Sequence, residues 1–408
     1  MIKNLLLQLA EEETMLIATR NYLHQYPELS GEEKNTLDYI RKRLSELQIP
    51  FTEVEKGGII ATLSGMGDAA PNHQQGLILL RADIDALPVE EHTDNLVQRK
   101  KVVSQKKGIA HVCGHDAHTA MLLTAAKILG KCRKDFNGTV LFCFERAEEG
   151  GGPGHSFGVD PLLAYMKEKK ICPDSCFALH VAPELATGKI SAEPAAVMAG
   201  SFGFEIHIKG KGGHGARPDL ANNPLDCFTA FYQALNSIRL RHISPHRLLT
   251  FSIPFVRSGT RGNVIDSELY FEGTARSLDH ESLVAFRDAF LKQLEHITQA
   301  FDCTFEIDLM YLEEPLYNNP AVARAVRDTV ELLFGSEQYE GCDPKLGSES
   351  FALYTAEYPG AMAFLGIRNE ELGSGAPLHE CRFDIDERAL RYGAGLLAGY
   401  ALHELGIK

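Results

Sequence analysis

Residues able to bind a metal ion are concentrated in the stretch GIAHVCGHDAH, residues 108–118. The stretch contains three imidazoles, one thiol and one carboxylate, which belong to His111, His115, His118, Cys113 and Asp116. Cysteine and histidine side chains one residue apart can turn into a common site where a loop enters a helix, and a helix N-terminus favours the thiolate that a metal needs. A single histidine of this kind is usually a core residue, but the density of this group favours a metal site.

Two adjacent glutamates follow a second apolar run, in the stretch FERAEEGGG (144–152). Glu148 and Glu149 come at the carboxyl end of an expected strand, where open α/β sheets place their ligands. The alternative interpretation of the two glutamates is a solvated acidic loop. The glycines that follow favour a ligand-binding loop instead, because they let the backbone approach a ligand. Neighbouring carboxylates can divide their work, with one binding a metal and the other accepting a proton from water.

Four further residues lie at comparable positions. His180 follows a strand-like run in CFALHV, and His379 lies in APLHEC; alone, each would more often be a surface or core histidine. Asp83 and Asp85 end another strand and share one face of it, which suits side chains that orient a metal ligand.

Two other motifs match known signatures only superficially. GKGGHG (210–215) has the spacing of a dinucleotide-binding loop, but Pro218 follows at once and no acidic residue lies near position 235. AGSFG (199–203) resembles a nucleophile elbow, yet Ser201 begins a strand instead of joining a strand to a helix. Neither a nicotinamide enzyme nor a serine hydrolase is therefore expected.

The elements that must position these residues alternate between helices and strands. Apolar periodicity predicts a helix over Ile2–Arg20 and another after a capping box at Ser30–Glu33. Further elements are expected as strands at Gly58–Leu63, Leu77–Ile84, Gly138–Phe144 and Ala361–Leu365, and as helices at Asp116–Leu129, Pro320–Leu333 and Glu387–Leu405. This alternation indicates an α/β domain with parallel strand pairs.

The pattern changes between residues 193 and 312. There the expected order is β-α-β-β-α-β, typical of a small α+β domain. Its strands are expected at Ser201–Lys209, Leu248–Val256, Glu268–Ala275 and Cys303–Tyr311, and its helices at Asn223–Arg239 and Glu281–Gln299. The 408 residues are thus expected to form a discontinuous domain, 1–192 plus 313–408, interrupted by a second domain at 193–312.

Composition excludes several classes of partner and location. With 41 Lys and Arg against 55 Asp and Glu, the net charge is −14, which disfavours binding to nucleic acid or anionic membranes. No run of apolar residues is long enough to span a bilayer. Nine cysteines without a CxxC pair are too few for a disulfide scaffold, so we expect a cytoplasmic protein.

Nine segments of the chain together resemble a known enzyme family. They are HQYPELSGEE (24–33), LRADIDALPVEE (80–91), HVCGHDAHTA (111–120), AEEGGG (147–152), ALHVAPELATGKI (178–190), GKGGHGARPD (210–219), GTRGNVIDSELYFEGTARSLD (259–279), GSESF (347–351) and PLHECRFDIDE (377–387). In this order they resemble the dinuclear-metal aminoacylase and carboxypeptidase family of amidohydrolases. The nearest branch contains hippurate hydrolases, N-acyl-L-amino-acid amidohydrolases and auxin-conjugate (IAA-amino acid) hydrolases.

The resemblance implies a role for each site residue. The metal ligands would be Cys113, His115, Glu149, His180 and His379, holding two divalent ions, with zinc favoured and manganese or cobalt as alternatives. Glu148 would be the general base, with Asp83 and Asp85 behind the ligands. In a homodimer formed through the small domain, His214 would act at the partner's active site, while Asn263 and Arg276 would bind the substrate's carboxylate.

The implied fold is a catalytic α/β domain with a largely parallel mixed sheet, interrupted by a smaller α+β lid or dimerisation domain. The implied function is metal-dependent hydrolysis of the amide of N-acyl amino acids or small peptides with a free carboxylate. Some positions depart from the family pattern: Glu145-Arg146, Ser350, Glu380-Cys381, and extra residues near 94–108 and 153–173. They motivate an alternative, a weak or silent member that binds an acyl amino acid or a protein partner.

Overall fold

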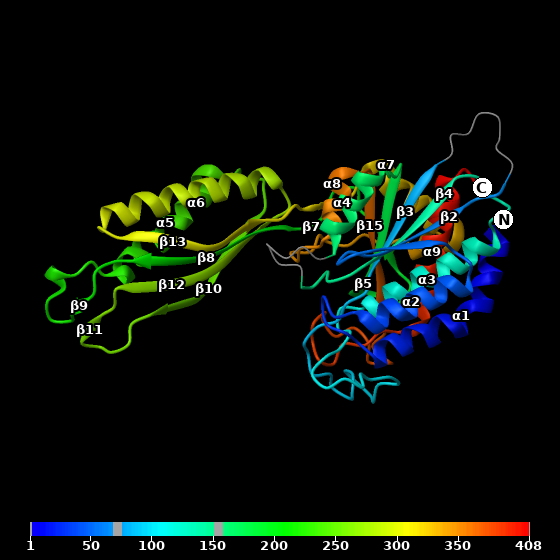
Figure 1. Ribbon diagram of the computed structural model, residues 1–408, viewed down its shortest axis with the longest axis horizontal. Helices are drawn as coiled ribbons and strands as arrows, with labels where there is room; N and C mark the ends of the chain where they lie inside the picture. The colour runs from blue at the N-terminus through cyan, green and yellow to red at the C-terminus, as the bar shows by residue number, and fades with distance from the viewer. Residues whose placement is uncertain (1, 68–75, 151–157, 408) are drawn as a thin grey trace. The chain divides into compact units, whose positions relative to one another are not determined.

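The computed structural model describes residues 2–67, 76–150 and 158–407, and the chain divides into two compact units (Figure 1). The first unit consists of Met1–Ala195, Tyr317–Asp343 and Leu353–Lys408, and the second of Ala196–Leu316 and Pro344–Ala352. Pro344–Ala352 thus groups with the second unit, although the sequence assigned it to the catalytic domain. The domain boundaries expected from the sequence stay predictions.

The first unit is built on a seven-stranded sheet with the strand order β1-β2-β4-β3-β5-β15-β6. Its strands are β1 (Phe51–Val54), β2 (Gly58–Ser64), β3 (Leu77–Asp83), β4 (Thr139–Glu145), β5 (Ser175–Ala186), β6 (Ile190–Ser191) and β15 (Gly360–Arg368). The neighbours β4, β3, β5 and β15 run parallel, whereas β1, β2 and β6 pair antiparallel. The expected mixed α/β sheet is confirmed, and its parallel strands form the centre.

Long helices cover this sheet. They are α1 (Ile2–Gln25), α2 (Lys34–Glu46), α3 (His115–Lys131), α4 (Val159–Lys169), α7 (Pro320–Phe334) and α9 (Leu390–Glu404); the short α8 spans Phe351–Glu357. Figure 1 shows α1, α2 and α3 side by side along one face of the sheet. The apolar stripe of α2, with Leu37, Ile40 and Leu44, is buried there as its spacing predicts. Among the described helices, none is both long and apolar enough to cross a bilayer.

Helix α3 is the buried centre of the first unit. Its residues from His115 to Ala126 are all buried, which is typical of a helix enclosed by protein on every side. Its first turn carries His115, Asp116 and His118, and buried polar side chains of this kind need partners. The charged end of α3 therefore has to lie in a polar site, while the rest of the helix anchors that site in the core.

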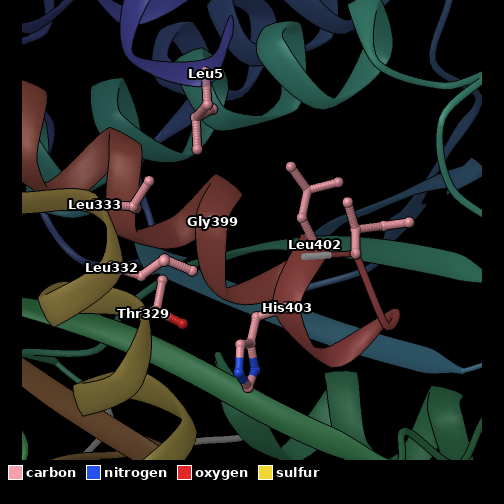
Figure 2. A pocket seen from close by; sticks show the side chains of 8 residues that line it. Leu5, Thr329, Leu332, Leu333, Gly399, Leu402 and His403 are labelled. Carbon is pink, nitrogen blue, oxygen red and sulfur yellow. The ribbon is translucent and has the colours of Figure 1, made fainter. Parts of the chain in front are cut away.

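The two ends of the chain meet beside α7. Leu5 of α1, Leu333 of α7 and Leu402 of α9 line a small apolar pocket there (Figure 2). Gly399 lets α9 approach α7 closely, because a Cβ at this position would lie 2.6 Å from Cδ1 of Leu333. The lining is mostly aliphatic, so this pocket belongs to the packing of three helices.

The second unit contains an antiparallel sheet of order β10-β12-β8-β13. In chain order its main elements are β8 (Gly200–Lys209), α5 (Pro224–His242), β10 (Leu249–Ser258), β12 (Glu268–Ser277), α6 (His280–Ala300) and β13 (Thr304–Leu312). Figure 1 shows α5 and α6 along one face of this sheet, and aromatic residues such as Phe202, Phe231 and Phe290 are buried in that core. A lid or dimerisation role for this unit stays a prediction.

Short elements complete the described chain. They are β7 (Ala196–Met198), β9 (Gly213–His214), β11 (Val264–Ile265), β14 (Leu316–Tyr317) and the single 3-10 turns Pro218–Leu220, Ser336–Gln338 and Glu387–Ala389. All helices and strands expected from periodicity are present, with their ends shifted by a few residues. Strand β1 and helix α4 were not expected; in β1 only Val54 is buried, so the strand has no apolar pattern.

The expected capping box at Ser30–Glu33 is wrong. Helix α2 begins at Lys34, and its first N–H groups, of Asn35 and Thr36, donate to the carboxylate of Glu28 at 3.1 and 2.8 Å. Ser30 Oγ instead donates to Asp85 Oδ2 at 2.6 Å, and Glu33 Oε1 accepts the backbone N–H of Ala147 at 2.8 Å. For Ser30 a carboxylate acceptor gives the stronger hydrogen bond, whereas Glu33 also accepts the local N–H of Gly31 at 2.8 Å.

Candidate metal centre

The candidate site lies where the parallel strands β3 and β4 end. Asp83 at the end of β3 pairs in register with Glu145 at the end of β4. The segments that follow, with Asp85 after β3 and Glu149 after β4, therefore leave the sheet side by side, and the backbone N–H of Glu149 donates to Asp85 Oδ2 at 3.0 Å. This is the edge at which parallel α/β sheets hold ligands.

The five residues expected to bind metal all belong to the first unit, and the structure brings their donor atoms together. Cys113 Sγ lies 3.4 Å from His180 Nε2, and His379 Nε2 lies 3.0 Å from Glu149 Oε1. Donor atoms within 4.8 Å of one another form two overlapping groups: Cys113 with His115 and His180, and Cys113 with Glu149 and His379. Cys113 belongs to both groups, which suits a thiolate shared between two ions.

Two histidines of these groups, His115 and His180, are held through Nδ1 by partners outside the groups. His180 Nδ1 donates to the carbonyl oxygen of Val181 at 2.8 Å, and His115 Nδ1 lies 3.1 Å from Asp85 Oδ1. These contacts orient both rings as metal-binding histidines require. Burial opposes protonation of His115, but the charge of Asp83 raises its pKa well above the ordinary value, so metal binding has to displace a proton from this ring. The buried Nε2 of His115 has no hydrogen-bond partner among the described residues. A cation between these groups would supply the missing partner, so the residues fit a metal ion.

His118 and His111, from the same sequence cluster, are used differently. His118 Nδ1 lies 2.7 Å from Asp83 Oδ1, and His118 Nε2 accepts the backbone N–H of Val181 at 3.0 Å. Both ring nitrogens are thus occupied, although Asp83, His115 and His118 form a third group of nearby donor atoms. Burial lowers the pKa of His111 to about 4, so this ring is neutral at pH 7.

The expected effect of the helix N-terminus on Cys113 is outweighed by burial. Burial raises the pKa of the Cys113 thiol well above its ordinary value, although the charge on His115 acts in the opposite direction. Burial also lowers the pKa of His180 well below its usual range, and His118 nearby adds to that shift. Because a metal needs a thiolate, binding has to displace the proton of Cys113, whereas His180 is already neutral.

Asp83 and Asp85 lie beside the donor groups, where each contacts a histidine of the first turn of α3. Burial disfavours the charged form of Asp85, but hydrogen bonds from His115 and Ser30 lower its pKa overall. Burial likewise opposes ionisation of Asp83, whose pKa the neighbouring His115 and His118 nevertheless hold well below the usual value. Both carboxylates are therefore charged and fix the rings of the first turn of α3.

The loop that carries Glu148 and Glu149 is held in an unusual conformation. Ala147, the residue before them, has a φ of +52°, which is rare for a side chain with a Cβ. Glu33 accepts the N–H of Ala147, and Arg146 Nε donates to Glu33 Oε2 at 2.8 Å. Glu148, Glu149 and His115 have donor atoms within 4.8 Å of one another. Gly151 and Gly152 of this motif lie outside the described residues.

Several charged residues around the site were missed from the sequence alone. Arg81 Nε donates to Glu145 Oε2 at 3.0 Å, and Arg81 Nη1 donates to Asp83 Oδ2 at 2.8 Å. All three side chains are buried. An arginine inside an otherwise apolar strand was the available signal, because a buried guanidinium requires carboxylate partners.

The other three expected site residues belong to the second unit. His214 on β9 pairs with Val264 on β11, and the N–H of Gly215 donates to the carbonyl oxygen of Asn263 at 2.9 Å, so His214 and Asn263 are neighbours. His214 Nδ1 accepts the N–H of Ala216 at 3.0 Å, which leaves its proton on Nε2. Arg276 lies on β12, where its Nη1 donates to Thr274 Oγ1 at 2.7 Å.

Gly114, between Cys113 and His115, offers a test of the backbone that carries the cluster. Its φ is +95°, and a Cβ would lie 2.4 Å from Cγ2 of Val181. Gly114→Ala is expected to reduce the free energy of unfolding by about 2 kcal/mol or more and to lower metal content. Gly130→Ala is the matched control: Gly130 lies in α3, the helix that Gly114 precedes, with nothing within 4 Å of its Cβ, and the substitution should stabilise by about 0.5–1 kcal/mol. Denaturant unfolding and metal analysis of both variants would check this, and equal effects would contradict it.

Known proteins resemble this chain over most of its length. Residues 79–403 match the model of peptidase family M20/M25/M40. The chain is 34% identical to thermostable carboxypeptidase 1 of Saccharolobus solfataricus over 94% of each chain, and 33% identical to N-acetyl-L-cysteine deacetylase of Bacillus subtilis over 96% of this chain and 87% of that protein.

A solved structure extends the similarity to the whole fold. It is a dinuclear metal-binding peptidase of the M20 family from Bacillus subtilis, with a TM-score of 0.80 and 28% identity, covering 98% of this chain and 100% of its own. The expected family and class of reaction, hydrolysis of an amide bond, are confirmed. The chain is a member of peptidase family M20/M25/M40.

Proposed function

We propose that the chain is a dinuclear metal amidohydrolase that cleaves the amide of N-acyl amino acids or small peptides with a free carboxylate. The observation that carries the proposal is the pair of donor groups that share Cys113, with the Glu148 carboxylate beside them. The named activities of the relatives, a carboxypeptidase and an N-acetyl-L-cysteine deacetylase, both belong to this class of reaction.

Each residue near the donor groups has a distinct task in such a reaction. Two divalent ions bound there would polarise the scissile carbonyl and make a water molecule more acidic. The Glu148 carboxylate would accept a proton from the attacking water and pass it to the leaving amine, which must be protonated to depart. Asp85 and the carbonyl oxygen of Val181 keep the rings of His115 and His180 oriented throughout.

Zinc is the ion we favour, with manganese or cobalt as alternatives. One thiolate, three imidazoles and one carboxylate form a donor set of intermediate softness, which all three ions accept.

A cytoplasmic location fits the nine cysteines, because all of them are free thiols.

The second unit would complete the site as a lid within a homodimer. His214 is exposed and carries its proton on Nε2, so it can donate a hydrogen bond to the oxyanion of the tetrahedral intermediate in the partner's site. Asn263 and Arg276 would bind the substrate's carboxylate, for which a guanidinium is well suited.

A matched pair of substrates tests the reaction and the carboxylate requirement together. Metal-reconstituted protein should release amino acid from a panel of N-acyl amino acids, and it should cleave the corresponding carboxamides roughly 10–100-fold less efficiently. Arg276→Met should remove this preference by raising KM for the acids, whereas Arg257→Met, on the neighbouring strand β10, should not. Loaded protein that binds metal but cleaves no member of the panel would favour the alternative, a silent member of the family.

A further inference from the structure

The extra segment 94–108 contacts the loop that carries His379. Asn95 Nδ2 donates to the carbonyl oxygen of Leu372 at 2.9 Å and to Asp384 Oδ2 at 2.8 Å. His92, just before the segment, donates its N–H to the carbonyl oxygen of Cys381 at 2.9 Å. Residues 92–95 therefore contact this loop both before His379, at Leu372, and after it, at Cys381 and Asp384. His379 is the most exposed of the five donor residues.

Lys100 is the buried centre of these contacts. Its side chain is only 1% exposed, and its Nζ donates to Glu91 Oε1 at 2.8 Å and to the carbonyl oxygen of Cys381 at 3.2 Å. Burying an ammonium group is costly unless it is paired and hydrogen-bonded. The second of these bonds reaches the backbone two residues after His379, at the carbonyl oxygen that also accepts the N–H of His92, so Lys100 is the side-chain donor that helps to hold this loop.

The Glu91 carboxylate also connects Lys100 to helix α3, which carries the ligand candidate His115. Glu91 Oε1 lies 2.9 Å from His24 Nε2, and His24 Nδ1 lies 2.8 Å from Asp116 Oδ2. Asp116 directly follows His115 in the first turn of α3. Although burial opposes ionisation of Glu91, the bonds from His24 and Lys100 lower its pKa to about 2. A continuous series of buried, charged contacts thus joins the His379 loop to the end of α3.

His379 itself has few other restraints. Its side chain is 52% exposed and its φ is +65°, a left-handed conformation that is unfavourable for histidine. Its backbone N–H donates to the carbonyl oxygen of Val112 at 2.8 Å, which places it beside Cys113. Without the contact between Lys100 and Cys381, this strained loop can relax and withdraw His379 from Cys113 and Glu149.

We propose that Lys100 is a positioning residue for one of the two metal sites, the one formed by Cys113, Glu149 and His379. It acts by holding the His379 loop against the loop that carries Cys113. The inference rests on the proposed dinuclear function, but it concerns the affinity of a single ion. Residues that orient metal ligands typically change metal affinity by about 10–100-fold when they are replaced.

Metal titration of the metal-free full-length chain tests the proposal. Lys100→Met is expected to weaken the binding of one Zn²⁺ or Mn²⁺ by roughly 10–100-fold in calorimetry and leave the other unchanged. Lys101→Met is the control, because Lys101 is 77% exposed and contacts only Glu387 among the ion pairs of the described residues. Should Lys100→Met fail to fold, Lys100→Met/Glu91→Gln removes the uncompensated carboxylate and should show the same weakened ion.

A double-mutant cycle with His379→Ala decides whether Lys100 acts through His379. If it does, Lys100→Met should cause no further loss of affinity, in a His379→Ala background, for the ion that His379→Ala already weakens. Equal weakening of both ions, additive effects of the two substitutions, or unchanged titrations of Lys100→Met would each overturn the proposal. If the wild-type chain bound no metal at all, the proposed function itself would fail, which is a separate outcome.

Discussion

Glu148→Gln is expected to lower kcat for amide hydrolysis by roughly 10²–10⁴-fold while both metal ions remain bound. Glutamine keeps the size of the side chain but cannot accept a proton from water. The attacking water then stays protonated, and the leaving amine loses its proton donor. Steady-state rates on an N-acyl amino acid, measured together with metal content, would give both quantities from one preparation.

The matched controls separate a base from a ligand. Glu149→Gln, at the neighbouring position, should lose metal as well as activity, because Glu149 belongs to the group with Cys113 and His379. Glu90→Gln changes an exposed glutamate and should leave kcat unchanged. If Glu148→Gln released an ion, Glu148 would be a ligand, as its proximity to His115 and Glu149 permits. A wild-type kcat would remove it from the mechanism.

Cys113→Ser is expected to weaken both ions, by more than about 100-fold each, and to abolish turnover. The reason is that Cys113 belongs to both donor groups, and a neutral hydroxyl is a much poorer ligand than a thiolate. His180→Ala and His379→Ala, which each affect one group, should weaken one ion each. Calorimetric titration with Zn²⁺ and metal analysis after dialysis would measure these differences.

Cys132→Ser is the control for this substitution. Cys132 lies directly after the opposite end of α3, is also buried, and makes no contact with the donor groups; its Sγ lies 3.7 Å from Gln8 Oε1. It should retain both ions. Loss of a single ion in Cys113→Ser would show that the thiolate serves one site only, and would leave a carboxylate or water between the ions.

The sequence predicted most of the strands and helices, and pointed to candidate metal-binding residues, because both depend on local patterns. Apolar runs such as that of β4 and the periodicity of α2 reflect burial on one or both faces. Cys113 and His115 could be recognised because a loop and the helix that follows it suffice to bring them together. His379 could be named from the residues only as a candidate, and its role as a ligand, which the resemblance to the family implies, stays a prediction.

What the sequence did not predict depends on contacts between distant segments. Ser30 and Glu33 have the spacing of a capping box, but they bind Asp85 and Ala147. The series from Lys100 through Glu91 to His24 joins three segments whose charges look like those of a solvated surface. Local periodicity cannot distinguish an exposed charge from a buried, paired one, because the difference lies in the partner.

The place of β15 in the sheet has a consequence for how the chain is made. This late strand lies between β5 and β6, which leave the ribosome long before it. Until β15 is synthesised, the apolar β5 has an open edge able to pair with other chains. The same delay applies to His379, which follows β15. Nascent chains therefore combine an unpaired edge with an incomplete Cys113, Glu149 and His379 group, so completion of this group and protection of the edge both belong to the last stage of synthesis.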